Sequence, residues 1–192
     1  MPVRPFLDSS PTLGERVYVD PLALVVGDVV LGDDVSIWPF TVVRGDSNYV
    51  RIGARSNVQD GSVLHIASPT AGNPVGYPLL VGEEVTIGHK AVVHACTVGH
   101  RCLVGIGAIV LDGAVIEDEV MIGAGSVVPP GKRLERGGLY LGSPARRVRD
   151  LTSAELARLV YMANHYVELK DAHAGSLAAP YAGPRAREPS PA

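Results

Sequence analysis

Aliphatic residues recur at about every sixth position through most of the chain, and a glycine often follows directly. This spacing differs from the 3.6-residue period of an amphipathic helix and from the two-residue alternation of a half-buried strand. A short repeat with glycine at its corners is typical of a parallel β-helix. The aliphatic anchors are Val26, Leu31, Ile37, Val43, Ile52, Val58, Leu64, Val81, Ile87, Val93, Val98, Val104, Val110, Ile116, Ile122 and Val128.

Two segments interrupt the repeat. Three hexads make one triangular coil, with each anchor pointing into a narrow core, and the aromatic content of 5% suits such a core. Residues 44–51 form a short excursion, and residues 68–78, rich in Pro and Gly, predict a loop thrown out from the solenoid. If this loop is a pure insertion, Val81, Ile87 and Val93 resume on the second, third and first faces.

The register brings particular polar residues together. Arg44, His65 and His94 each follow an anchor of the first face, so they should stack on successive coils, about 4.8 Å apart. Asp60 and His89 share another corner. Two imidazoles one coil apart can bind one metal ion, since Zn–N bonds are about 2.0–2.1 Å. His89 lies round a corner from the pair, so we expect a neighbouring subunit to supply it, and a three-fold assembly would form three such sites.

Several short motifs together resemble the gamma-class carbonic anhydrases and their close homologues. The match covers most of residues 10–170. The motifs are Arg44-Gly45-Asp46, Asn57-Val58-Gln59-Asp60, His65, Ile87-Gly88-His89, Val93-His94-Ala95-Cys96 and Gly142-Ser143-Pro144-Ala145-Arg146.

This resemblance implies a homotrimer of left-handed β-helices with zinc, or iron in some members, at each subunit interface. His65 and His94 would come from one chain and His89 from the next. In the family the residues that match Arg44 and Asp60 form a salt bridge between subunits.

Other site residues are carried over from the same resemblance. Gln59 and Asn57 match residues that hydrogen-bond the metal-bound water or the substrate, and Asp46 belongs to the same interface network. In many relatives a tyrosine at the place of Tyr166 approaches the metal. Packing in the core or at an interface is an equal alternative for Tyr166.

The implied activity is reversible hydration of CO2 to bicarbonate by a metal-bound hydroxide, a zinc lyase reaction. Three neutral imidazoles leave Zn²⁺ an open position for water, whose pKa falls to about 7. The best-studied form of the family carries proton-transfer acids where this chain has Ser47, Asn48 and residues 66–68. Members without these acids are often weak or inactive, so the resemblance does not imply a high turnover.

Three other functions fit a hexapeptide repeat. An acyltransferase would use one histidine as general base and bind acyl-CoA along a groove between subunits, with the 68–78 loop beside it. A thioesterase that keeps the metal is a narrower variant. A catalytically weak structural trimer could use the same three histidines to hold a metal. Against the transferase, the sequence has no basic cluster for the CoA phosphates.

Length and composition predict one folded domain with tails. The 192 residues divide into a β-helix domain (1–150), a C-terminal α-helix (151–171) packed along its flank, and a flexible tail (172–192). Thr152 and Glu155 form a capping box at the helix start. The tail is dominated by Ala, Pro, Gly and Ser, a composition that cannot bury enough apolar area to repay its ordering entropy.

The charge and hydropathy of the sequence argue against nucleic-acid and membrane partners. A net charge of −3 gives no basic surface for nucleic acid. The N-terminus lacks the features of a signal peptide, and no apolar run approaches the 18 residues of a membrane span. We therefore expect a cytoplasmic protein with no membrane partner. Cys96 and Cys102 lie on adjacent faces and are expected to be buried thiols.

Overall fold

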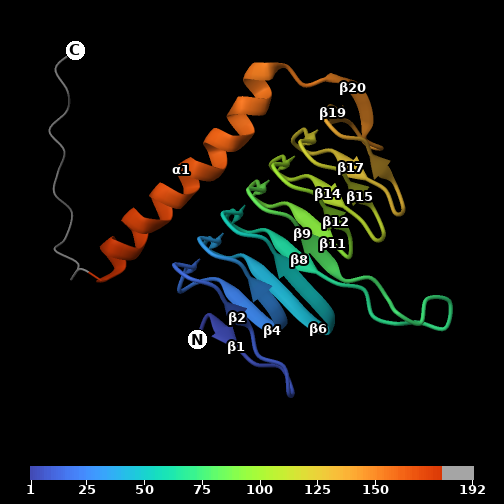
Figure 1. Ribbon diagram of the computed structural model, residues 1–192. Coiled ribbons are helices and arrows are strands. Elements are labelled where there is room, and N and C mark those ends of the chain that lie inside the picture. Colours follow the sequence, from blue (N-terminus) through green and yellow to red (C-terminus); the bar gives the residue numbers. More distant parts are fainter. Residues whose placement is uncertain (179–192) are drawn as a thin grey trace, which may run out of the picture.

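The computed structural model describes residues 1–178 and shows a parallel β-solenoid with one long helix running along its side (Figure 1). Residues on successive coils typically pair with partners 18 positions away, as Tyr18 does with Ser36 and Leu103 with Met121. Eighteen residues correspond to three hexads. The predicted all-β fold, a β-helix with a C-terminal helix on its flank, is therefore confirmed.

The strands lie on three faces and form sheets of twelve and eight strands. The first face carries β4 (Leu24–Leu31), β6 (Val42–Ile52), β8 (Val63–His65), β11 (Val92–His94), β14 (Ile109–Val110) and β17 (Val127–Val128), with β1 (Val3–Arg4) beside β4. The second face carries β2 (Thr12–Leu13), the second halves of β4 and β6, β9 (Leu79–Val81), β12 (Thr97–Val98), β15 (Val115–Ile116) and β18 (Arg133–Leu134). The third face carries β3 (Tyr18–Val19), β5 (Ser36–Ile37), β7 (Asn57–Val58), β10 (Thr86–Ile87), β13 (Leu103–Val104), β16 (Met121–Ile122), β19 (Gly138–Leu141) and the antiparallel β20 (Arg146–Asp150).

The loop at residues 68–78 is a pure insertion, as the repeat predicts. Across it, register partners such as Asn57 and Thr86 lie 29 rather than 18 positions apart, and the difference equals the length of the loop. Val81, Ile87 and Val93 therefore pair with the anchors of the preceding coil on the second, third and first faces. Figure 1 shows this loop extending away from the stacked coils.

Two details of the first face differ from the repeat. The inward anchor of the early coil is Val25, which pairs with Val43, rather than Val26. The excursion at residues 44–51 is part of β6, an eleven-residue strand that follows β4 round the corner between two faces. Gly27 (φ +85°) permits this close approach, since a Cβ there would lie 2.0 Å from the Gly45 carbonyl oxygen.

Helix α1 (Ser153–Ala178) packs on the third face through aromatic and charged side chains. Trp38 is buried, with Tyr166 at 5.5 Å and His173 at 4.9 Å between ring centroids. Lys170 is only 1% exposed and lies 3.0 Å from the Asp34 carboxylate. These contacts fix where Tyr166 sits relative to the solenoid.

The helix starts as its sequence predicts and ends later. Thr152 Oγ1 accepts a hydrogen bond from the Glu155 amide (3.2 Å), and Glu155 accepts one from the Thr152 amide (2.9 Å), which completes the capping box. Residues 172–178, placed by prediction in a flexible tail, are helical, and the remainder of the predicted tail lies outside the described residues. In the described part of the chain, no helix combines the length and apolarity needed to cross a membrane.

Both cysteines are unbonded thiols buried in the core, as expected. Burial raises the pKa of Cys102 to about 12 and raises the pKa of Cys96 still further, where the charge of Asp112 adds to the effect. Because only the thiolate reacts, iodoacetamide at pH 8 should leave both thiols unmodified in the folded protein and modify both in guanidinium chloride. Mass spectrometry checks this, and rapid labelling of the folded protein would contradict the burial.

Candidate functional site

Two histidines meet on the first face. Val43 pairs with Leu64 and Leu64 with Val93, so the residues that follow these anchors share one edge. His65 and His94 are direct register partners, and their ring centroids are 5.3 Å apart. His65 Nδ1 lies 3.3 Å from His94 Nε2.

The separation of these nitrogens suits a shared metal ion. Two nitrogens that bind one tetrahedral zinc ion at about 2.0–2.1 Å lie roughly 3.3–3.4 Å apart. Burial lowers the pKa of His65 against the opposing effect of Asp46, and this favours the neutral imidazole that a metal requires. The pair therefore fits two positions of a metal site.

Each of these rings has a carboxylate at its other nitrogen. His65 Nε2 is 3.2 Å from Asp46 Oδ1, and His94 Nδ1 is 2.6 Å from Asp112 Oδ1. Arg44 also pairs with Asp46. Burial raises the pKa of Asp46, but the hydrogen bonds from His65 and Arg44 outweigh that effect and hold its pKa below the ordinary value. Metal-binding histidines commonly donate their second N–H to such a carboxylate.

The third histidine lies on a different corner of the coil. His89 Nδ1 is 3.0 Å from Asp60 Oδ2, which is the shared corner that the register predicts. Among residues 1–178, no three His, Cys, Asp or Glu side chains come close enough to hold a metal together. Within one chain the arrangement thus offers a histidine pair and a separate histidine, each backed by a carboxylate.

Asn57 and Gln59 form a buried polar chain beside His89. Asn57 Nδ2 donates to Thr86 Oγ1 (2.9 Å), and Gln59 Nε2 donates to Asn57 Oδ1 (3.2 Å). These bonds leave the Gln59 carbonyl oxygen available as an acceptor. Gln59 and His89 line the same cleft.

This cleft, with a volume of about 320 Å³, lies between the third face and α1. Leu103, Ile106, Met121 and Met162 make its wall largely apolar. Tyr166 also lines it, and burial, together with the charge of Asp60, raises the pKa of its phenol. Its ring packs on Trp38, as one of the two alternatives predicts, and its approach to a metal stays a prediction.

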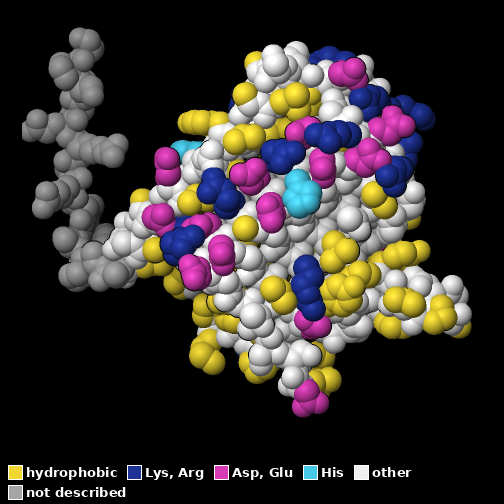
Figure 2. Space-filling model, in the orientation of Figure 1, with side chains coloured by type: hydrophobic (Ala, Val, Ile, Leu, Met, Phe, Trp, Pro, Cys, Tyr) yellow, Lys and Arg dark blue, Asp and Glu magenta, His cyan; other side chains and the backbone are white. Residues whose placement is uncertain are grey.

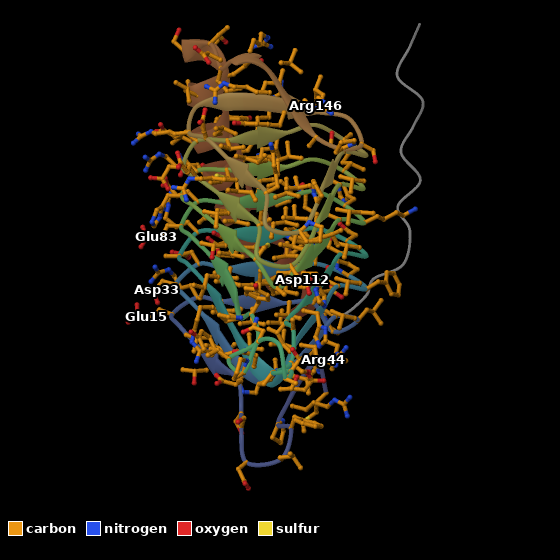
Figure 3. The ribbon with its side chains drawn as sticks, turned by 90° about the vertical axis from the view of Figure 1, so that its right-hand side faces the viewer. Glu15, Asp33, Arg44, Glu83, Asp112 and Arg146 are labelled. Carbon is orange, nitrogen blue, oxygen red and sulfur yellow. The ribbon has the colours of Figure 1, made fainter. Side chains whose placement is uncertain are left out.

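The sequence interpretation did not find Asp112 or the cleft. Asp112 lies 18 positions after His94, so one coil length was the available signal. Figure 3 shows Asp112 on the same side of the solenoid as Arg44, whereas Glu15, Asp33 and Glu83 line the other edge. The predicted partners Arg44 and Asp60 pair separately within the chain, with Asp46 and His89 respectively, and their contact between subunits stays a prediction.

Comparisons with known proteins agree with this architecture. The family model "Bacterial transferase hexapeptide (six repeats)" matches residues 10–45. Protein YrdA of Escherichia coli is 56% identical over 88% of this chain and 92% of its own length. A carbonic anhydrase of Geobacillus kaustophilus is 39% identical (86% and 87% covered), and mitochondrial gamma carbonic anhydrase 1 of Arabidopsis thaliana is 41% identical (90% and 62% covered). The crystal structure of a Bacillus cereus putative acetyltransferase is similar, with a TM-score of 0.85 and 35% identity over 91% of this chain and 97% of that one.

Proposed function

Because the chain belongs to the gamma carbonic anhydrase family of hexapeptide-repeat proteins, we propose that it hydrates CO2 reversibly at a metal site shared between two copies of the chain. The convergence of His65 Nδ1 and His94 Nε2 to 3.3 Å is the observation that carries this proposal. These two residues would hold the metal, and His89 of a neighbouring subunit would complete the ligand set. Zinc is the proposed ion, with Fe²⁺ as the alternative.

The outer surface of the first face supports a shared site. The outward positions that precede the buried anchors form one aliphatic stripe across successive coils, where a free surface would carry polar residues. This aliphatic stripe consists of Leu24, Val42, Val63, Val92, Ile109 and Val127, each a register partner of the next. The stripe runs beside His65 and His94.

The corner that carries His89 offers a complementary surface. Phe40 is 67% exposed and Ile106 is 56% exposed on either side of the Asp60–His89 pair along the stacked coils. A contact between this corner and the aliphatic stripe joins two different surfaces of the same chain, which makes it heterologous. Such contacts close into rings when the rotation permits, and a ring of three would bury both surfaces in every copy.

The chain's own residues would supply binding and orientation. A bound zinc ion lowers the pKa of a coordinated water to about 7. The Gln59 carbonyl oxygen would accept a hydrogen bond from the attacking water, and Asn57 holds the Gln59 amide in place. CO2 is apolar, so the apolar wall of the cleft would accommodate it. Tyr166 would border the same space, and Arg44, Asp46 and Asp60 would orient the ligands and the interface.

The residues that replace the family's proton-transfer acids hold the 68–78 loop instead. Ser47 Oγ lies 2.6 Å from Ser68 Oγ, and Asn48 Nδ2 donates to the Val75 carbonyl at 2.9 Å. We propose that these positions anchor the loop and that proton transfer to bulk water takes another route. The reaction would then be limited by proton transfer and respond strongly to buffer concentration. The cytoplasmic location stays a prediction.

Metal analysis combined with oligomer mass and stopped-flow CO2 hydration tests the proposal. One metal per chain, a mass about three times that of the chain, and hydration by zinc- or iron-loaded protein are expected. Metal-free monomers, or a metal-loaded trimer without hydration, would reject it. The second result would favour the structural trimer.

Gln59→Ala tests the hydrogen bond to the attacking water. The variant should bind metal as the parent does, while kcat/KM for CO2 hydration falls by about 10²-fold, the effect of losing one well-placed hydrogen-bonding group. Stopped-flow assays on matched metal loadings measure this. Asn73→Ala, which removes an amide within the 68–78 loop, should leave the rate unchanged. An unaltered rate in Gln59→Ala would show that this amide does not contact the reaction.

Acyl transfer remains the second candidate because one feature favours it. Contrary to our interpretation of the sequence, basic residues gather around a hollow of about 310 Å³ at the last coil, which Glu135 and Tyr140 also line. The basic residues are Lys132, Arg133, Arg146 and Arg147. On the face shown in Figure 2, basic and acidic side chains are interspersed near this end. Arg133 and Arg147 are already paired with Glu117 and Asp150. Calorimetric titration with acetyl-CoA distinguishes the two functions, and we expect no saturable binding.

A further inference from the structure

The short contact between His94 and Asp112 defines the state of the His94 ring. Asp112 Oδ1 lies 2.6 Å from His94 Nδ1, on the side of the ring opposite the nitrogen that faces His65. A carboxylate only accepts hydrogen bonds, so Nδ1 must carry the proton. In the neutral ring, Nε2 then keeps its lone pair and directs it toward His65 Nδ1.

Asp112 differs from Asp46 in its surroundings. Asp46 is shared between His65 and Arg44, which neutralises much of its charge. Asp60 backs His89 on the other corner. Within the described chain, Asp112 forms an ion pair with His94 and with no other residue. Its charge is not shared with an arginine, as that of Asp46 is, and besides His94 it also acts on the Cys96 thiol, whose pKa it raises.

We propose that Asp112 is a positioning residue that fixes the Nδ1–H tautomer and the orientation of His94. The effect of Asp112 on metal affinity rests on the proposed function. Its effect on the tautomer of His94 does not. The carboxylate comes from the coil after His94 and reaches back across one coil spacing. Because Asp46 backs His65 from the coil before it, the histidine pair and its two carboxylates come from four successive coils of one chain.

The tautomer can be measured without any metal. In metal-free protein carrying ¹⁵N-labelled histidine, long-range ¹H–¹⁵N spectra distinguish a protonated Nδ1 from a protonated Nε2. We expect His94 to be in the Nδ1–H form in the parent. In Asp112→Ala the Nε2–H form should become the major one, because nothing then holds the proton on Nδ1.

Zinc affinity provides the second readout. Loss of such an outer carboxylate commonly weakens metal binding by 10–100-fold, and a loss of about that size is expected for Asp112→Ala in chelator competition. Asp112→Leu fills the volume of the side chain without offering a hydrogen bond. If the alanine variant fails to fold, zinc affinity is measured on the leucine variant instead. Asp118→Ala is the matched control, because Asp118 also accepts a hydrogen bond from 18 positions back, at the His100 amide.

The outcomes separate this inference from the proposed function. Parental tautomer and parental zinc affinity in the Asp112 variants would overturn the inference alone. A parent that binds no metal, but whose His94 tautomer changes in Asp112→Ala, would remove the proposed function and support the positioning role. An equal loss of zinc affinity in Asp118→Ala would overturn the specific role and point to general loosening of the solenoid.

Discussion

A mixture of His89→Ala and His94→Ala chains should regain metal that neither variant binds alone. In the proposed trimer, each site takes His65 and His94 from one chain and His89 from the next. A His89→Ala chain keeps an intact histidine pair, and a His94→Ala chain keeps an intact His89. Wherever the two meet in the right order, a complete site forms.

The expected recovery is quantitative. In randomly assembled trimers from an equal mixture, three quarters contain both chains, and each of these has one complete site of three, so about a quarter of the parental metal content returns. Co-expression with two affinity tags isolates the mixed trimers in the doubly purified fraction, whose metal content is then measured. Doubly purified trimers should carry one metal each.

A second mixture provides the matched control. His65→Ala and His94→Ala both damage the pair on the first face, so no arrangement of these chains gives a complete site. This mixture should remain free of metal. Recovery here, or failure in the first mixture despite confirmed mixed trimers, would show that His89 does not cross between subunits.

The sequence predicted the parts of the site that depend on register. A hexapeptide repeat fixes which residues stack, because each anchor must point into the core and each coil must close after three hexads. The pairing of His65 with His94 across the 68–78 loop, and of Asp60 with His89, follow from this counting alone. The 68–78 loop does not change the register, since an insertion at a corner leaves the inward positions of the following coils unaltered.

The features that the sequence did not predict depend on contacts between distant elements. The cleft exists only because α1 docks on the third face, where Lys170 pairs with Asp34 and Tyr166 packs on Trp38. In both pairs the two partners lie far apart in the sequence. The helix continues through residues of low apolar content because its last turns extend a helix already nucleated. Asp112 escaped notice because a corner aspartate is common, and only its distance from His94 distinguishes it.

Ile109→Glu should convert the trimer into monomers and abolish metal binding while the solenoid stays folded. Ile109 belongs to the aliphatic stripe, between Val92 and Val127 on the neighbouring coils, and points away from the core. In a monomer the glutamate would be solvated at little cost. In the trimer it would be buried without a partner, and that costs several kcal/mol. Light scattering measures the mass against the 20.1 kDa chain.

Val115→Glu is the control, because Val115 occupies the equivalent outward position on the second face, beside Thr97 and Arg133. It should remain trimeric and keep its metal. The two variants carry the same charge on adjacent faces, so a difference between them can arise only from what each face contacts. If Ile109→Glu loses metal because its subunits separate, then at chain concentrations high enough to restore the trimer the metal should return. A trimeric Ile109→Glu protein with full metal content would show that the aliphatic stripe is not the interface, and the partner's histidine would have to arrive by another face.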